Sequence, residues 1–385
     1  MSELESGKAF QIASKFCFPR LSGTQGEVEA QKIAKRLFEN IGLKPIEDEF
    51  QASYLMINLF ARIALFPFGL FLLLAGIFYQ HRNPFLSLSF FLLGLSFGLG
   101  FALYCQSSPK FLGWRKKHWT KNIFACAGSE NAKQNVLVVA HYDSKSQIFP
   151  GWLRVLVYYL GGFFSLAISL LGIYLCFDLW KNQVFHRLGL EATIFTGLVD
   201  FLPLFNRTAN HSPGAVDNAG ALGVVFELAR IFKEKPLKHT RLWLVLTGAE
   251  ELGLIGAREF VEKHQAELDP QKTFVINLDG LGSGYKICAL SRLGFPGKKT
   301  SSQLNHLLYQ ISERRALRFK MIRASIGFST DAYHFLKKGY QTISIGCLSK
   351  YVHTPEDSVE KLISQNLDDY LDVLIELIAH LDKKQ

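Results

Sequence analysis

The sequence of 385 residues lacks several features that mark common classes of protein. Its six cysteines are widely scattered, with no CxxC pair and no disulfide-framework spacing, so we expect reduced, structural thiols. The amino terminus, MSELESGKAFQIASKF, has no apolar core, which argues against a cleaved secretory signal. There is no internal repeat, no low-complexity tract and no glycine-rich phosphate loop. Together these absences disfavour a disulfide scaffold and translocation by a cleaved signal.

Apolar residues, by contrast, are abundant. They make up 49% of the chain, 33 residues are phenylalanine, and the formal net charge is +10. This combination indicates a membrane before it indicates nucleic acid. The stretch WRKKHWTK interleaves aromatic and basic residues, as single-strand binders do, but it directly follows an apolar segment. We therefore interpret it as an anchor to anionic lipid and expect no nucleic-acid partner.

Four apolar segments are candidates for crossing a bilayer. Phe85–Cys105 and Val155–Cys176 are uncharged and about twenty residues long, the length that a bilayer core requires. Ile57–Tyr79 carries Arg62 near its start, where an arginine can extend to the interface. Leu188–Phe205 contains charged residues, so we expect a weak span or a re-entrant or interfacial helix there. An even number of crossings is required if the flanking soluble pieces form one domain, so we expect four; buried core helices are the alternative.

The distribution of basic residues predicts an orientation. Eight Lys and Arg residues near the spans lie on the side of the soluble sequence, against three on the far side. We therefore expect an integral protein of a bacterial-type inner membrane with its soluble part in the cytoplasm. Two glycosylation-type triplets, Asn206-Arg207-Thr208 and Asn210-His211-Ser212, hint at the opposite side, but such triplets often arise by chance.

The soluble sequence forms three pieces, 1–56, 106–150 and 206–385, interrupted by a hairpin insertion at 57–105 and a second membrane insertion at 151–205. Strand-like runs such as NVLVVAHYDS alternate with helical patterns such as AGALGVVFELARIFKE. This alternation predicts an α/β fold with a mixed, mostly parallel sheet and helices on both faces. In such sheets ligands bind beyond the carboxyl ends of the strands.

Polar residues gather at those predicted strand ends. Each of them alone has an ordinary explanation, such as a helix cap or a turn. Clustered carboxylates, however, repel one another unless a cation compensates them. The residues are His141, Asp143, Asp217, Glu250, Glu251, Asp279 and His353. Two imidazoles and three carboxylates among them suit two zinc ions with one bridging carboxylate, and manganese or cobalt are further options. Of the adjacent glutamates, one would bind metal while the other acts as general base.

The order of the motifs HYD, GAVDN, GAEELGLIGAREF, NLDG and YVHTPEDS resembles the co-catalytic zinc aminopeptidase family, whose relatives include glutamate carboxypeptidase and glutaminyl cyclase. The resemblance implies one zinc held by His141, Asp217 and Asp279 and another held by Asp217, Glu251 and His353. It also implies Glu250 as the base and Asp143 as the residue that orients His141. The chain departs from the family pattern at Ala219-Gly220 and at Thr330-Asp331-Ala332. These departures affect the shape of the substrate pocket rather than the metal ligands.

Three functions follow from this reading. The first is a membrane-embedded exopeptidase with a peptide substrate, in the simplest form an aminopeptidase. The second is a glutaminyl cyclase-like acyltransferase with a single zinc, because HYDSK is shared with those enzymes. The third is a scaffold or binding relative that has lost the metals. The sequence leaves open the side-chain preference, the choice between amino- and carboxypeptidase, the native metal and the oligomeric state.

Overall fold

The chain folds into two compact units. The first, which we call the sheet unit, comprises Met1–Ala52, Lys117–Ser146 and Ala209–Gln385. The second, the bundle unit, comprises Ser53–Lys116 and Gln147–Thr208. The computed structural model describes residues 6–55, 57, 62, 65–106, 117–129, 132–177, 183–284, 286–294, 297–323, 329–346 and 349–383.

The sheet unit is built on one mixed sheet with the strand order β1-β2-β6-β3-β7-β11-β8-β10. Its four central strands, β6, β3, β7 and β11, run parallel, whereas β2 is antiparallel to β6 and β8 is antiparallel to β11. At the far edge β10 runs parallel to β8, and β9 pairs antiparallel with β8. The strands are β1 (Ile46–Ser53), β2 (Lys117–Ala127), β3 (Gln134–His141), β6 (Thr240–Thr247), β7 (Thr273–Leu278), β8 (Lys286–Leu293), β9 (Lys298–Lys299), β10 (Arg318–Arg323) and β11 (Gln341–Ile345). The expectation of a mixed, mostly parallel sheet is confirmed.

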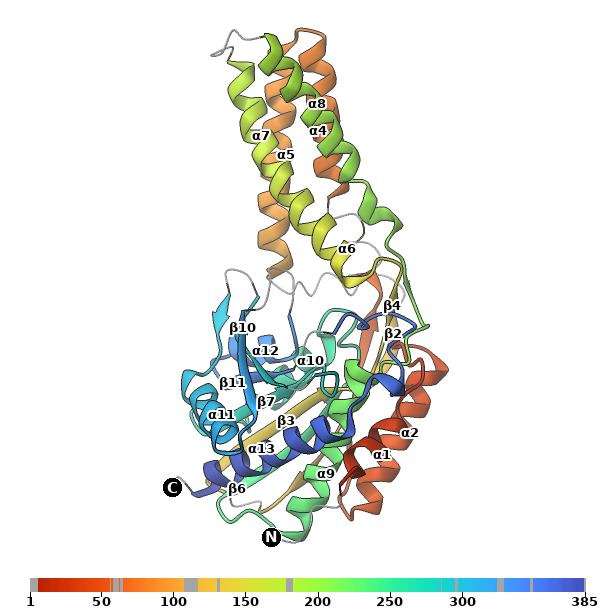
Figure 1. Cartoon of the computed structure of the whole chain (residues 1–385), viewed down its shortest axis with the longest axis vertical. Coiled ribbons are helices and arrows are strands. Elements are labelled where there is room, and N and C mark those ends of the chain that lie inside the picture. The colour runs from red at the N-terminus through yellow and green to blue at the C-terminus, as the bar shows by residue number, and fades with distance from the viewer. Residues whose placement is uncertain are drawn as a thin grey trace. The chain divides into compact units, whose positions relative to one another are not determined.

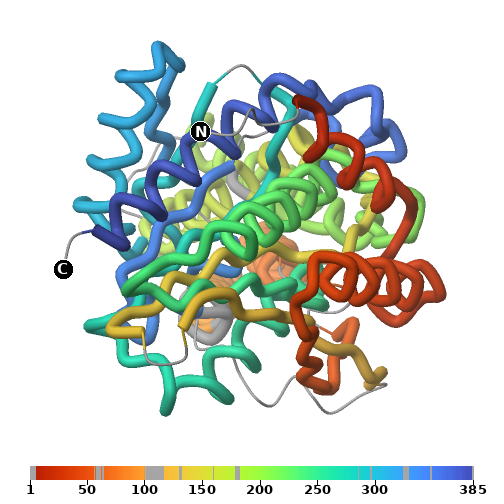
Figure 2. The backbone as a smooth tube through the Cα atoms, turned by 90° about the horizontal axis from the view of Figure 1, so that it is seen from below, coloured from red at the N-terminus to blue at the C-terminus, as the bar shows by residue number. Residues whose placement is uncertain are grey.

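Both faces of this sheet are buried, which explains why its central strands are apolar without alternation. Along β3, Val136, Val138 and Ala140 belong to one buried cluster, whereas Leu137 and Val139 belong to another. Helices α1, α2, α9, α11 and α13 contribute side chains to the first cluster, and α10 and α12 contribute to the second. Figure 2 shows α1 and α2 beside α9. The helices are α1 (Lys8–Ser14), α2 (Gln25–Asn40), α9 (Gly220–Glu234), α10 (Ile255–His264), α11 (Ser302–Arg314), α12 (Ala332–Lys337) and α13 (Ser364–Lys383).

The bundle unit consists mainly of four apolar helices, drawn side by side in Figure 1. Helix α4 packs against α5 and α8, and α7 completes the ring by packing against α5 and α8. A short helix and a π-helical turn lead into α7, and a 3-10 turn, Leu202–Phe205, follows α8. The helices are α4 (Phe66–Gln80), α5 (Pro84–Gln106), α6 (Gly151–Val155), α7 (Gly161–Cys176) and α8 (Gln183–Val199). The two-residue strands β4 (Ser146–Gln147) and β5 (Thr208–Ala209) lie where the chain passes between the units.

Glycines allow these helices to approach closely. A Cβ atom at Gly172 of α7 would lie 2.1 Å from the ring of Phe91 in α5. A Cβ at Gly69 of α4 would lie 2.6 Å from both the carbonyl oxygen of Gly197 and the Cβ of Asp200 at the end of α8. Small residues at helix crossings are typical of membrane helices, where backbones pack in close contact.

Within the part of the chain that the structure describes, two continuous helical segments are long and apolar enough to cross a membrane, namely Gly151–Cys176 and Gln183–Phe205. Gln183–Phe205 contains Leu188–Phe205, for which the sequence predicted only a weak span. The helical segment there begins five residues earlier than expected. Shorter apolar helical stretches are Phe66–Gln80, which is α4, and Pro84–Gly98, which is the first part of α5. Most of 56–64, in the first predicted span, lies outside the described residues.

Candidate metal centre

Three parallel strands deliver polar side chains to one edge of the sheet. His141 is the last residue of β3, Glu250 and Glu251 follow β6, and Asp279 comes directly after β7. The carboxyl ends of parallel neighbours meet at the same edge, so these side chains come together as the sequence predicted. Asp217 joins them from the turn before α9. The peptide bond between Asp217 and Asn218 in this turn is cis.

Two groups of three potential ligands form there and share one carboxylate. His141, Asp217 and Asp279 make one group; Asp217, Glu251 and His353 make the other, with the candidate ligand atoms of each group within 4.8 Å of one another. Asp217 turns a different oxygen to each imidazole. Its Oδ1 lies 3.1 Å from Nε2 of His141, and its Oδ2 lies 3.1 Å from Nε2 of His353. All five residues predicted as metal ligands are therefore assembled at one place.

The donor set fits divalent zinc. His141 is 2% exposed, and its Nε2 atom has no hydrogen-bond partner among the described residues although carboxylate oxygens surround it. Burial disfavours the charged imidazole, yet the carboxylates of Glu250, Asp143, Asp217 and Asp279 raise the pKa of His141 well above its usual value. A buried imidazole nitrogen without a hydrogen bond, facing several carboxylates, is the arrangement that zinc ligands adopt.

Glu250 lies beside the two ligand groups without belonging to either. Its carboxylate is 8% exposed and 3.9 Å from Nε2 of His141. Burial, together with the charges of Glu251 and Asp279, raises the pKa of Glu250 well above the usual value for a glutamate. The preceding residue, Ala249, has a φ of 52°, a left-handed conformation that is costly for a side-chain-bearing residue and occurs mainly at functional sites. Glu250 thus has the position and environment of a proton acceptor.

Asp143 holds the two glutamates as well as His141. Its carboxylate oxygens accept hydrogen bonds from the backbone N–H groups of Glu250 (3.1 Å) and Glu251 (3.2 Å). The atom nearest to Nδ1 of His141 is the backbone carbonyl oxygen of Asp143, at 3.1 Å, whereas the carboxylate is 3.7 Å away. The side chain therefore fixes the turn after β6, while the backbone of the same residue orients the imidazole.

Lys145 binds the ligand Glu251 at two points. Its ammonium lies 2.8 Å from Oε2 of Glu251, and its backbone N–H donates to Oε1 of the same carboxylate at 3.2 Å. Burial would raise the pKa of Glu251, but His353 and Lys145 lower it to about 2. The carboxylate of Glu251 is therefore ionised across the physiological range.

Two charged residues that the sequence did not single out fix the turn that carries Asp217. Asp357, which is fully buried, accepts hydrogen bonds from the backbone N–H groups of Val216 (2.8 Å) and Asp217 (3.1 Å). Arg20 is also fully buried, and among the described residues its side chain donates to main-chain oxygens. The bond from its Nε to the carbonyl oxygen of Tyr142 is 2.6 Å long. Its acceptors are the carbonyl oxygens of Phe16, Phe18, Tyr142, Pro213 and Gly214.

A second carboxylate that the sequence did not assign is Asp331. It is 1% exposed and accepts a short hydrogen bond from the hydroxyl of Thr247, while its Oδ1 has no partner among the described residues. Burial raises the pKa of Asp331 to about 7. The sequence predicts that the motif STDAYHF affects the shape of the pocket, but its aspartate also interacts electrostatically with Glu250 and Asp279. The sequence signal that could have pointed to Asp331 is a carboxylate directly before a helical pattern.

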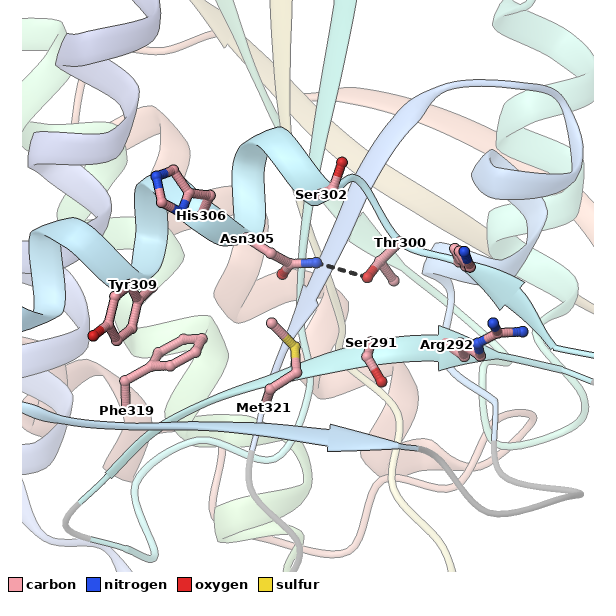
Figure 3. Close-up of a pocket in the computed structure, with 10 residues that line it drawn as sticks. Ser291, Arg292, Thr300, Ser302, Asn305, His306, Tyr309, Phe319 and Met321 are labelled. Carbon is pink, nitrogen blue, oxygen red and sulfur yellow. Dashed lines mark hydrogen bonds between the residues drawn. The ribbon is translucent and has the colours of Figure 1, made fainter.

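A separate cavity of about 450 Å3 lies elsewhere in the sheet unit, between α11 and strands β8 and β10 (Figure 3). Its lining contains none of the seven residues predicted for the centre. It is therefore not the pocket of the metal centre.

Comparison with known proteins agrees with this geometry. The sequence model of peptidase family M28 matches residues 191–378, which include Asp217, Glu250, Glu251, Asp279 and His353. This part of the chain, just under half of its length, is similar to peptidase family M28. The resemblance to zinc aminopeptidases is thereby confirmed. The curated Aminopeptidase YwaD of Bacillus subtilis is 26% identical over 184 residues, which are 45% of this chain and 39% of YwaD. The chain thus matches well under half the length of YwaD.

Solved structures of the same fold include both peptidases and cyclases. A zinc aminopeptidase from Bacillus subtilis, BSAP, superimposes with a TM-score of 0.58 at 15% identity, covering 98% of this chain and 95% of BSAP. The aminopeptidase of Aneurinibacillus sp. strain AM-1 gives 0.57 at 14% identity, covering 96% and 92%. A glutaminyl cyclase from an Acidobacteriales bacterium gives 0.56 at 14% identity, covering 98% and 94%. These likenesses establish that the chain has the fold that zinc aminopeptidases share with glutaminyl cyclases.

Proposed function

We propose that this chain is a membrane-anchored zinc aminopeptidase with two metal ions. The observation that carries the proposal is the pair of ligand groups that share Asp217. His141 and Asp279 would complete the first zinc site, and Glu251 and His353 the second. When bound, zinc would acidify a water molecule so that it becomes a nucleophile near neutral pH.

The chain's own residues would then position the substrate's reacting groups and move the proton. Glu250 would accept a proton on its carboxylate and deliver it to the leaving amine nitrogen, since it lies next to the ligands without belonging to them. Asp143 would hold Glu250 in place through the backbone N–H of that residue. The burial of Glu250, with its carboxylate 3.9 Å from Nε2 of His141, supports a role in which this group carries the proton between the two steps.

Replacing Glu250 with glutamine tests this assignment. We expect kcat for free-amino dipeptides to fall by about 10²- to 10⁴-fold, because the base is lost while the shape of the side chain is kept. Zinc content should stay at the wild-type level, since Glu250 belongs to neither ligand group. The measurements are hydrolysis of matched free and acetylated peptides by detergent-purified protein and metal analysis of the same samples. Unchanged hydrolysis in Glu250→Gln would disprove the role.

A glutaminyl cyclase-like reaction is the second candidate, supported by the HYDSK motif and by cyclases among the structures of similar fold. The two candidates differ in metal count. A wild-type chain with two zinc ions, falling to one in Asp279→Asn, would favour the peptidase. One zinc in the wild type, together with cyclisation of amino-terminal glutamine and no peptide hydrolysis, would favour the cyclase. A purified chain that binds no metal would instead support a scaffold.

Membrane anchorage by the bundle unit is supported by its surface. Large apolar side chains point outward along its helices, for example Phe85, Phe163 and Phe195, which are 76%, 65% and 69% exposed. Such a surface is unusual in a water-soluble bundle and suits lipid. The charge asymmetry of the flanking residues favours a cytoplasmic sheet unit. Protease digestion of the sheet unit in inverted but not in right-side-out membrane vesicles would support that side; the reverse pattern would exclude it.

A further inference from the structure

The positive charge of the protein is concentrated in one part of the sheet unit. Between residues 286 and 323 the sequence has nine Lys and Arg residues and one acidic residue, Glu313. Nine minus one leaves +8, against +10 for the whole chain. The nine are Lys286, Arg292, Lys298, Lys299, Arg314, Arg315, Arg318, Lys320 and Arg323.

Three of these cations stand in one row across three strands. In the pairing of β8 with β9, Arg292 lies directly opposite Lys299, and in the pairing of β8 with β10 it lies opposite Arg323. The pairing with Lys299 is regular, so Arg292 and Lys299 project from the same face of the sheet at close range, where like charges are destabilising. The register of β10 shifts between Ile322 and Arg323, so Arg323 pairs with Arg292 across a bulge. We call Arg323, Arg292 and Lys299 the cation row.

No acidic side chain compensates the row within the described part of the chain. None of the three residues forms an ion pair there, whereas Arg314 and Arg315 do pair with acidic residues of α13. Two neighbouring segments are not among the described residues, 295–296 and 324–328. Their sequences, FP and ASIGF, contain no acidic residue. Charges on an edge strand commonly prevent edge-to-edge association, which accounts for cations on β10. It does not account for Arg292, because β8 lies inside the sheet.

The cavity of about 450 Å3 lies beside the row and combines two kinds of wall (Figure 3). Arg292 and Lys299 line one side of it, and Tyr309, Phe319 and Met321 line another. The hydroxyl-bearing residues at the first side are Ser291, Thr300 and Ser302. No acidic residue is among its lining residues.

Asn305 of α11 points from the helix toward this space. It is 6% exposed, its Nδ2 donates to Oγ1 of Thr300 at 2.8 Å, and its Oδ1 has no partner among the described residues. This orientation of the amide is fixed, because the hydroxyl of Thr300 donates to the carbonyl oxygen of Leu290 and can only accept from Asn305. The unpaired atom is therefore an acceptor buried without a donor, a cost that a hydroxyl or other donor on a bound molecule can remove.

We propose that the cation row and this cavity bind the phosphate group of an ester that carries an apolar substituent. Several cations around one oxyanion are the arrangement that recognises phosphate, with arginine as its bidentate partner. The apolar walls formed by Tyr309, Phe319 and Met321 suit the substituent. The phosphate could belong to a soluble ester or to a lipid headgroup, and the chemistry of recognition is the same.

This site is distinct from the metal centre. Strand β8 runs antiparallel to β11, which is itself parallel to β7. Arg292 lies near the carboxyl end of β8, and Asp279 follows the carboxyl end of β7. Because these two strands run in opposite directions, the two residues lie at opposite ends of the strands. The proposal does not depend on peptidase activity, so its failure would leave the proposed function unaffected.

The first test uses the full chain in detergent free of phosphate and phospholipid, with inorganic phosphate as the probe. The test variant is Arg292→Gln with Lys299→Gln; the matched control, Lys298→Gln with Lys320→Gln, removes two neighbouring charges outside the row. We expect phosphate to raise the Tm of the wild type and of the control by mass action. In the test variant the apparent Kd should be about tenfold weaker.

The second test distinguishes the sources of phosphate. The full chain is placed in nanodiscs of phosphatidylcholine with or without phosphatidic acid, and hydrogen exchange of β10 is compared. Protection that requires phosphatidic acid and is lost in the test variant assigns the site to a lipid headgroup. A response to inorganic phosphate in detergent without any lipid effect assigns it to a soluble ester.

Two results would overturn the proposal. One is that neither phosphate nor phosphatidic acid distinguishes the test variant from the wild type. The other is that the control loses binding as strongly as the test variant, which would indicate a diffuse charge effect. Folding is monitored in the same experiment, because removing like-charge repulsion should raise the Tm of the test variant in phosphate-free buffer. A lower Tm there would contradict the repulsion from which the proposal starts.

Discussion

Two fully buried charges, those of Arg20 and Asp357, hold the segment on which the shared ligand Asp217 depends. Asp357 binds the N–H groups of the turn, and Arg20 binds carbonyl oxygens just before it. Gly214 makes this possible, since it has a φ of 62° and a Cβ there would lie 2.8 Å from Nη1 of Arg20. The position of a metal ligand is thus determined by residues that would not touch the metal.

The variant Arg20→Met should show this dependence. It leaves several buried carbonyl oxygens without a donor, each costing about 1–3 kcal/mol, so we expect a clear loss in the free energy of unfolding. Zinc affinity should fall as well, and Arg20→Lys should restore part of it because one cationic donor returns. Denaturant unfolding and competition with a zinc chelator measure the two effects. Zinc affinity equal to the wild type in folded Arg20→Met would show that the residue is structural only.

A buried glutamate remote from the metal ligands gives a pH prediction. Glu27 is 1% exposed and accepts hydrogen bonds from Ser22, Gly23 and Thr120, yet burial raises its pKa from 4.5 to about 7. The folded state therefore binds the proton more tightly than the unfolded state. Its contribution to stability is complete below the unfolded pKa of 4.5 and is lost as the pH rises through about 7.

We accordingly expect the Tm of Glu27→Gln to decline less than that of the wild type between about pH 5 and pH 8, because glutamine is never charged. Thermal unfolding across this range measures the difference. Parallel Tm curves for the two proteins would mean that Glu27 keeps an ordinary pKa.

At the scale of elements, glycine positions determine how the bundle helices pack. Gly172 faces Phe91 at a distance that excludes any side chain, whereas a Cβ on Gly162, in the same helix, would meet nothing nearer than 4.0 Å. Gly172 and Gly162 therefore form a matched pair for testing the crossing of α5 and α7.

We expect Gly172→Val to lower the Tm in detergent, since overpacking typically costs about 1–3 kcal/mol. Gly162→Val should change the Tm little, because a Cβ there meets no close neighbour. Both variants place the same residue in the same helix, so the effect of helix propensity is matched. Thermal unfolding in detergent compares them directly. An equal loss in both would mean that helix propensity, rather than the contact with Phe91, sets the stability.

At the scale of the whole molecule, the proposed metal centre predicts that stability depends on zinc. Asp217, Glu251 and Asp279 come from distant parts of the chain and repel one another without a cation. We expect chelation to lower the Tm, and zinc at several hundred times its Kd to restore about 3–4 kcal/mol. The variant Asp217→Ala, which loses the shared ligand, should barely respond. A Tm indifferent to chelator in the wild type would argue against resident metal.

The sequence by itself determined the fold class, the apolar segments and the ligand-bearing strand ends. These features are local: a buried strand reads as an apolar run, and a residue such as His141 or Asp279 reads as polar directly after it. The order of the strands and the meeting of their ends then follow from general rules for parallel sheets.

Only the tertiary structure revealed the supporting residues and the cation row. Arg20 meets Gly214 across 194 positions of sequence, and Asp357 meets Val216 across 141, so no local pattern marks either contact. Arg292 stands between Arg323 and Lys299 only because β8 pairs with both β9 and β10. Local patterns determine which side chains are buried or exposed, but contacts between distant segments exist only once the sheet has formed.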